Sequence, residues 1–103
     1  MAAAKKTAVA ASTSPLRPVV YEGVTVNVDD KKLSTWHAFE LIGVISDESS
    51  TAFVKLNAVF ALLEYATDTN KQAVVDACGG DDADPTEVIK YALGLVTAIA
   101  PKN

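Results

Sequence analysis

Hydrophobic residues recur at spacings of three and four over residues 50–66, which is the period of one face of an α-helix. The residues that set this spacing are Phe53, Leu56, Phe60 and Leu63. At about 100° per residue, four more apolar residues widen the face to roughly half of the helix circumference: Ala52, Val59, Leu62 and Ala66. Because so broad a face needs several neighbours to cover it, we predict that residues 50–66 form the central helix of a small domain.

Before this helix the pattern changes to the two-residue period of a half-buried strand. Three valines alternate with polar residues in Val24–Val28, and the strand pattern extends back to Val19 with one break. Gly23 marks either a bulge or a turn between two short strands. An isolated strand leaves its backbone groups unpaired, so it needs a hairpin partner or a strand from another subunit. This need, together with the broad apolar helix faces, predicts that the protein self-associates.

Residues 29–45 predict a polar turn followed by a helix. The turn covers residues 29–32, and the helix covers residues 33–45 with Ser34 or Asp30 as its N-cap. The apolar face of this helix comprises Ala38, Phe39, Leu41, Ile42 and Ile45. Three residues fall on or beside the opposite side: Trp36, His37 and Glu40.

Two helices are predicted after the central one. Thr69 and Gln72 have the spacing of a capping box, which opens a short helix over residues 70–78. Gly79 and Gly80 end it. Asp84 is followed by proline and, two residues later, by glutamate, which is a strong start signal for a last helix that runs to about residue 100.

These elements predict a mainly α fold, a small helical domain of about four helices with a short N-terminal β strand or hairpin. With 103 residues the chain is one domain at most. Residues 1–18 are rich in Ala, Ser, Thr and Lys, and Pro15 and Pro18 block a regular helix at their end. We therefore predict a flexible N-terminal arm over residues 1–18 and a single helical domain over residues 19–103.

Charge is divided unevenly along the chain. Residues 1–18 hold three basic residues and no acidic one, whereas the remainder holds six basic and thirteen acidic residues. An acidic body repels phosphates, which argues against binding to nucleic acid or to an anionic membrane. No apolar stretch approaches the roughly 20 residues that span a bilayer. A lone cysteine, Cys78, fits a reducing compartment, so we expect a soluble intracellular protein.

Residue types that carry catalysis or bind metals are sparse. His37 is the only histidine, which excludes a histidine-based metal cluster. Asp81–Asp84 resembles the start of a calcium loop but lacks its glycine and terminal glutamate, and Pro85 interrupts it. Gly79-Gly80 lacks the Lys-Ser/Thr of a phosphate loop, and Cys78 lies at a helix C-terminus near acids, where a thiolate is disfavoured. We therefore expect no enzyme activity, no catalytic residue, no cofactor and no metal ion.

An acyl carrier or adaptor protein is a less favoured alternative. Small acidic helical carriers hold their prosthetic group on a serine at the start of a helix, and Ser49 and Ser50 precede the central helix. The carrier signature places a bulky aliphatic residue directly after the serine. Here Ser50 is followed by Thr51 and Ala52.

Aromatic residues off the apolar faces are the remaining candidates, because aromatic side chains are favoured anchors of interfaces. Trp36 lies off the main face of its helix with Glu40 near it, Tyr65 lies off the face of the central helix, and Tyr91 flanks the face of the last helix. We predict these four as partner-binding residues.

The order of the predicted elements resembles a known family over about residues 19–100. A valine-rich strand segment precedes a helix with the sequence STWHAFEL (Ser34–Leu41), a long helix ending ALLEY (Ala61–Tyr65), a short helix ending in Gly-Gly and a helix capped by Asp-Pro-Thr-Glu. This arrangement is similar to that of the tail assembly chaperones of long-tailed (siphovirus-type) bacteriophages. The resemblance implies a non-enzymatic chaperone in the host cell cytoplasm, which binds the tape measure protein, keeps it soluble during tail assembly and is absent from the virion.

The family commonly makes a short form and a frameshifted long form from one reading frame. Pro101-Lys102-Asn103 at the end of the chain would contain the slippery heptamer A-AAA-AAC if its codons were CCA AAA AAC. The resemblance thus implies a short form whose partners are the tape measure protein, the frameshifted long form and further copies of itself. The alternative within phages is a head–tail or tail structural component that is retained in the virion.

Overall fold

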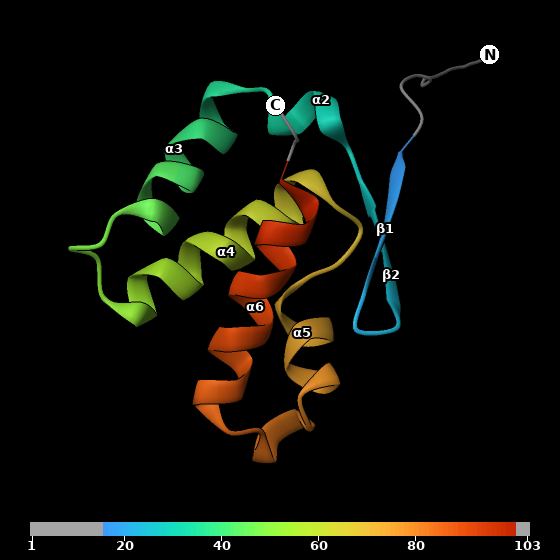
Figure 1. Ribbon diagram of the computed structural model, residues 1–103, viewed down its shortest axis with the longest axis vertical. Helices are drawn as coiled ribbons and strands as arrows, with labels where there is room; N and C mark the ends of the chain where they lie inside the picture. Colours follow the sequence, from blue (N-terminus) through green and yellow to red (C-terminus); the bar gives the residue numbers. More distant parts are fainter. Residues whose placement is uncertain (1–15, 101–103) are drawn as a thin grey trace.

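The computed structural model describes residues 16–100 and consists of a helical domain with a β hairpin along one side (Figure 1). The elements in chain order are β1 (Arg17–Tyr21), β2 (Val24–Val28), α2 (Asp30–Leu33), α3 (Trp36–Ser46), α4 (Ala52–Ala66), α5 (Lys71–Ala77), the 3-10 turn η1 (Gly80–Asp82) and α6 (Pro85–Ile99). The predicted fold class, mainly α with an N-terminal hairpin, is confirmed. Residues 1–15 of the predicted arm and residues 101–103 lie outside the described part of the chain.

Strands β1 and β2 pair antiparallel over all five residues of each strand. Glu22 and Gly23 join them with φ angles of 50° and 80°, and two successive positive φ angles are the property of a type I′ turn. Gly23 is therefore a turn residue and not a bulge. Strand β1 begins at Arg17, two residues earlier than predicted. Because each strand finds its partner within the hairpin, an unpaired strand no longer argues for self-association.

Two side-chain caps divide the segment that we predicted as one turn and one helix. Asp29 caps α2 by accepting hydrogen bonds from the backbone N–H groups two and three residues on. Thr35 caps α3, because its Oγ1 accepts a hydrogen bond from the Ala38 N–H (3.3 Å). The predicted N-caps were wrong, since Asp30 is the first residue of α2 and Ser34 follows its last residue.

The caps of the two C-terminal helices match the prediction in one case and not in the other. Asp84 caps α6 as predicted, accepting a hydrogen bond from the Thr86 N–H (2.8 Å). Thr69 was the wrong residue for α5, because Asn70 is the N-cap and accepts a hydrogen bond from the Ala73 N–H (2.9 Å). Helix α5 is correspondingly one residue shorter at its start than predicted.

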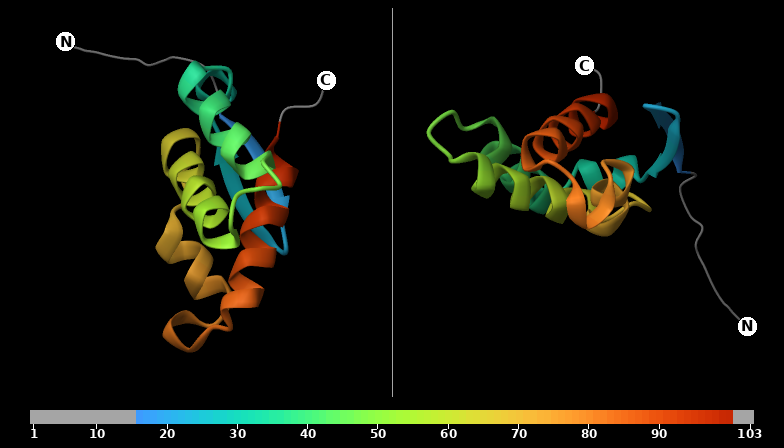
Figure 2. Two further views of the ribbon diagram at one scale, coloured as in Figure 1. Left: turned by 90° about the vertical axis from the view of Figure 1, so that its left-hand side faces the viewer. Right: turned by 90° about the horizontal axis from the view of Figure 1, so that it is seen from below.

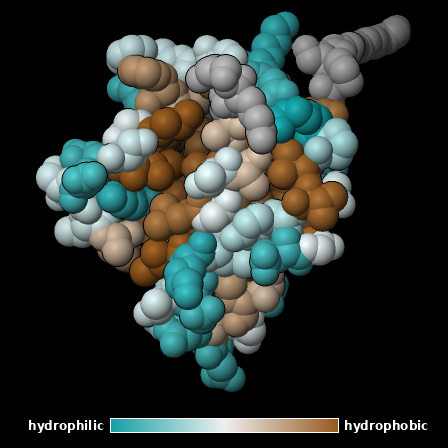
Figure 3. All heavy atoms as spheres, in the orientation of Figure 1, coloured by the Kyte–Doolittle hydropathy of each residue, from teal (hydrophilic) through white to brown (hydrophobic). Residues whose placement is uncertain are grey.

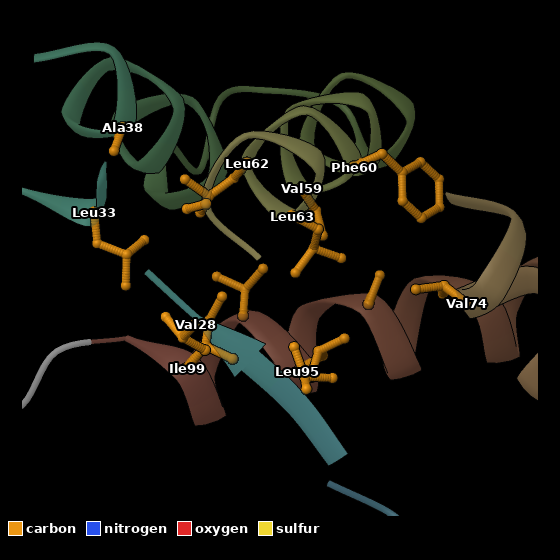
Figure 4. Close-up of a cluster of buried hydrophobic side chains, with 14 of the residues drawn as sticks. Val28, Leu33, Ala38, Val59, Phe60, Leu62, Leu63, Val74, Leu95 and Ile99 are labelled. Atoms are coloured by element: carbon orange, nitrogen blue, oxygen red, sulfur yellow. The ribbon is translucent and has the colours of Figure 1, made fainter. Parts of the chain in front are cut away.

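The hydrophobic core lies between α4, α6 and the inner face of the hairpin (Figure 4). Leu62 and Leu63 of α4 point toward α6, Leu95 and Ile99 of α6 point back, and Val28 of β2 lies between them (Figure 4). Among the described residues no polar or charged side chain is buried, so the core is purely apolar. The second half of α4 is thus the centre of the domain, as predicted for this helix.

Two aromatic side chains that we predicted to be buried are exposed. Phe53 is 71% exposed and Phe39 is 64% exposed. Phe53 lies in the first turns of α4, which extend away from α6 together with α3 (Figure 1). The hairpin lies at the opposite side of the molecule from the α3–α4 connection, so it does not cover them either (Figure 2, right). Helical periodicity locates a face, but it does not show how much of the helix length the neighbours cover.

Candidate functional site

An apolar groove of about 240 Å³ lies between α3, α4 and α6. Leu62 of α4 contributes to it from the core, Ile42 and Ile45 line it from α3, and Val96 and Ile99 line it from α6. Figure 3 shows hydrophobic atoms gathered on this face of the molecule, with hydrophilic atoms around them. The two isoleucines are only half-buried, so their α3 wall offers apolar surface to a partner.

The groove contains little polar chemistry. Its polar side chains are Ser46 and Thr97, and the Thr97 hydroxyl donates a hydrogen bond to the Leu93 carbonyl oxygen (3.0 Å). None of its lining residues is charged at neutral pH. Such a site can bind an apolar surface.

The connection that follows α3 carries a charged group, the Asp47 carboxylate. Beyond Ser46, Asp47 accepts hydrogen bonds from the Ser49 hydroxyl (2.7 Å) and from the Ser49 N–H (2.9 Å). These bonds hold the pKa of Asp47 below its ordinary value, so this connection carries negative charge. The Ser49 hydroxyl is thereby engaged with a carboxylate, and Thr51, not a serine, caps α4.

An arginine binds the C-terminal end of α6, whose last residues line the groove. Arg17 of β1 donates a hydrogen bond from Nη2 to the Ile99 carbonyl oxygen at the end of α6 (2.8 Å). The same guanidinium forms two hydrogen bonds of 2.8 Å with the Asp30 carboxylate, which lowers the pKa of Asp30. The hydrogen bonds of Arg17 therefore connect strand β1 to helix α2 and to the C-terminus of α6 beside the groove.

Of the four predicted partner-binding residues, Trp36 and Glu40 lie together on the exposed side of α3. Trp36 is 70% exposed, and its ring contacts that of Phe39 with centroids 5.4 Å apart. Gly43 continues this side of the helix, and nothing lies within 4 Å of the position that its Cβ would occupy. We call Trp36, Phe39, Glu40 and Gly43 the α3 outer face.

Tyr65 lies at the junction of α2, α3 and α4, where its side chain is half-buried. Its hydroxyl is 3.0 Å from Thr35 Oγ1, and its ring meets that of His37 edge-on at 4.7 Å. The Lys32 ammonium lies 5.4 Å from the centre of the ring. Much of the Tyr65 side chain is thus used in contacts within the chain.

Tyr91 lies on the opposite side of the domain, against the hairpin. Its ring packs edge-on against Tyr21 with centroids 5.1 Å apart, beside an open pocket that also contains Cys78. Burial is the main cause that raises the pKa of Tyr91, and burial also raises the pKa of Cys78 with help from Glu87. The thiol form of Cys78 is therefore favoured over the thiolate, in the direction that the sequence predicts.

The four predicted residues therefore occupy three separate surfaces. Sequence reasoning assigned the groove residues Ile42 and Ile45 to the core, and it likewise assigned Phe39 to the buried face. Within residues 16–100 no three metal-binding side chains lie close enough to hold an ion. That span also contains no helix long and apolar enough to cross a membrane. Comparison of the chain with protein families, curated sequences and solved structures found no match.

Proposed function

We propose that the protein is a non-enzymatic chaperone that binds an apolar helical segment of a partner in the groove between α3, α4 and α6. The observation that carries this proposal is the groove itself, which is apolar, free of charge and half open along Ile42 and Ile45. Amphipathic helices bind grooves of this kind through apolar side chains at positions i, i+3, i+4 and i+7.

Within this class we propose the short form of a tail assembly chaperone of a long-tailed bacteriophage, acting in the host cytoplasm. The order of hairpin, helix pair, short helix and Asp84-capped helix supports this, because the sequence resemblance rests on the same order. The partner is the tape measure protein, a long helical protein that exposes apolar stripes before the tail tube assembles around it. A frameshifted long form of the chain is a second proposed partner.

The acidic surface suits a chaperone that must stay soluble while it carries an apolar client. The described residues include six basic and thirteen acidic side chains. Like charge on the complexes opposes their aggregation.

Co-expression with the tape measure protein of the same genome tests the proposal. We expect the soluble yield of the tape measure protein to rise severalfold with the wild-type chain and to fall back with Ile42→Asp, which places a charge in the groove wall. Val20→Asp on the hairpin is the matched control, since Val20 is 70% exposed and lies outside the groove. Circular dichroism would check that both variants are folded.

Two outcomes would overturn the proposal. A tape measure protein that stays equally insoluble with and without the wild-type chain would remove the chaperone function. Abundant chain in purified virions, measured by mass spectrometry, would replace the chaperone by a structural head–tail or tail component.

A further inference from the structure

The α3 outer face combines two exposed aromatic rings with a glycine that the fold does not require. Trp36 and Phe39 are 70% and 64% exposed. Gly43 lies in the middle of α3, where glycine costs about 0.5–1 kcal/mol relative to alanine. Its φ is not positive and no described atom lies within 4 Å of its missing Cβ, so nothing inside the domain needs the small residue. A surface that approaches α3 from outside would need it.

The spacing along this face is that of a helix-pairing seam. Trp36, Phe39, Gly43 and Ser46 follow one another at intervals of three, four and three residues, as do the a and d positions of a coiled coil. The first two side chains of the seam are large and the last two are small. A partner helix should therefore carry small side chains opposite the large ones of α3, and large side chains opposite the small ones.

A second copy of α3 meets this requirement when the two helices run antiparallel. If their centres meet at Leu41, Trp36 of each copy lies opposite Ser46 of the other, and Phe39 lies opposite Gly43. Each aromatic ring then fills the space beside a small residue, as a knob fills a hole. Parallel helices would instead place ring against ring and glycine against glycine.

The α3 helix carries little charge. Glu40 is the only acidic residue of α3, and the helix holds no lysine or arginine. The described chain as a whole has thirteen acidic and six basic residues, so two copies repel one another over most of their surface. In the register centred on Leu41 the two Glu40 side chains come close to each other, so like-charge repulsion at this point weakens the dimer. A basic partner would find only this single carboxylate on α3.

We propose that the α3 outer face, extended by Ser46, pairs with the same face of a second copy to form a two-fold symmetric dimer. The four aromatic side chains would bury on the order of 600 Å² together. A stable interface buries about 1,200–2,000 Å², so the dimer is weak and depends on protein concentration. The proposal does not rest on the chaperone function, because it follows from the shape of α3 alone.

Trp36 is the only tryptophan of the chain, so its fluorescence reports directly on this face. We expect the emission maximum to shift to the blue over the concentration range in which sedimentation shows the mass doubling. A monomeric mass up to the solubility limit would overturn the proposal. Doubling of the mass without a change in emission would also overturn it, since the dimer would then use another surface.

A substitution at Gly43 separates the dimer from the stability of the monomer. Gly43→Ala should raise the unfolding midpoint, because the added Cβ meets open space and favours the helix. The same variant should lower the dimer association constant about tenfold, because the added methyl group separates the helices. Equal or tighter association of this variant would contradict close helix contact at Gly43.

An exchange of the large and small residues tests the antiparallel register. Gly43→Phe alone should abolish the dimer, and Phe39→Ala together with Gly43→Phe should restore it, since each phenylalanine again faces a small residue. Val20→Ser on the hairpin removes an equally exposed side chain and should leave the dimer intact. A folded double variant that stays monomeric would overturn the register, and loss of the dimer in Val20→Ser would move the interface to the hairpin.

Discussion

Gly94 and Gly43 both lie inside helices, but their surroundings differ completely. Gly43 faces open space, whereas the hairpin crosses α6 at Gly94 so closely that a Cβ there would clash with the Tyr21 hydroxyl and lie 2.9 Å from Tyr21 Cζ. Gly94 therefore lets Tyr21 lie over α6, where it also meets Tyr91 edge-on. The contact between hairpin and helix depends on the absence of one methyl group.

Gly94→Ala should destabilise the protein by about 1–3 kcal/mol, because Tyr21 must leave its position over α6. Higher helix propensity offsets at most about 1 kcal/mol of this. Urea unfolding of the variant in the wild-type and Tyr21→Ala backgrounds measures the effect. The penalty should vanish without the Tyr21 ring and reveal the propensity gain, and an equal loss in both backgrounds would exclude a clash with Tyr21.

At the scale of elements, sequence patterns located both strands and the helices α3, α4, α5 and α6. They missed α2, which was predicted as a polar turn, and they misplaced several ends. Asp84 was identified as a cap because Asp84, Pro85 and Glu87 occupy the N-cap, N1 and N3 positions, where these residue types are favoured at a helix start. Thr35 and Asn70 each stand beside another residue with capping ability, Ser34 and Thr69, and the local sequence does not favour one of the two. Tertiary contacts then decide which of the two residues caps the helix. Thr35 is an example, because its hydroxyl also contacts the Tyr65 hydroxyl.

The groove was not predictable for a related reason. Ile42 and Ile45 have the spacing of a buried face, and the structure places them on the face of α3 that turns toward the core. Their half-burial depends on the distance between α3 and α6, which no local pattern encodes. Phe53 was misassigned because the first turn of α4 lies beyond its neighbours, and Phe39 was misassigned because it belongs to the exposed side of α3.

Strand β2 and the α4–α5 connection are joined by an asparagine–aspartate pair. Asp68 accepts hydrogen bonds from the Asn27 side chain (2.8 Å) and from the Asn27 backbone N–H (2.9 Å), in this order the main causes that lower the pKa of Asp68. The Asp68 N–H in turn donates to the Asn27 carbonyl oxygen (3.1 Å). The carboxylate form thus holds the hairpin to the segment that leaves the central helix.

This pair should make the free energy of unfolding depend on pH. Because the folded-state pKa of Asp68 is lowered, its contribution is present above the unfolded pKa of about 3.9 and is lost as the pH falls through the folded value. Asp68 is exposed, so we expect less than about 1 kcal/mol. Urea unfolding between about pH 6 and pH 2 should show a smaller acid loss in Asp68→Asn than in wild type. Identical pH profiles would show that the pair does not contribute.

In the whole molecule, α3 is the most weakly held of the long helices. Ala38 is its only fully buried residue, whereas α4 and α6 each bury five or more. Local opening requires less free energy where fewer apolar contacts are lost. The helix that lines the groove and carries the α3 outer face is therefore the one most able to adjust to a partner.

Amide hydrogen exchange should reveal this difference. We expect the α3 amides to exchange at least tenfold faster than those in the second half of α4 and in α6, because α3 opens without unfolding of the core. Protein concentration high enough for the dimer should slow exchange in α3 while leaving the slowest α6 amides unchanged. Equal protection of α3 and α6 in dilute protein would show that the two helices open together.

The hydrogen bond from Arg17 to the Ile99 carbonyl brings the first strand and the last helix within the length of one arginine side chain. A short linker could join the two ends of the described chain at this place, and new termini could open in the exposed α3–α4 connection at residues 47–50. Such a circular permutant would keep the core, the hairpin and the groove. It would also separate α3 from α4 in sequence, which turns the pairing of these helices from a local contact into a long-range one.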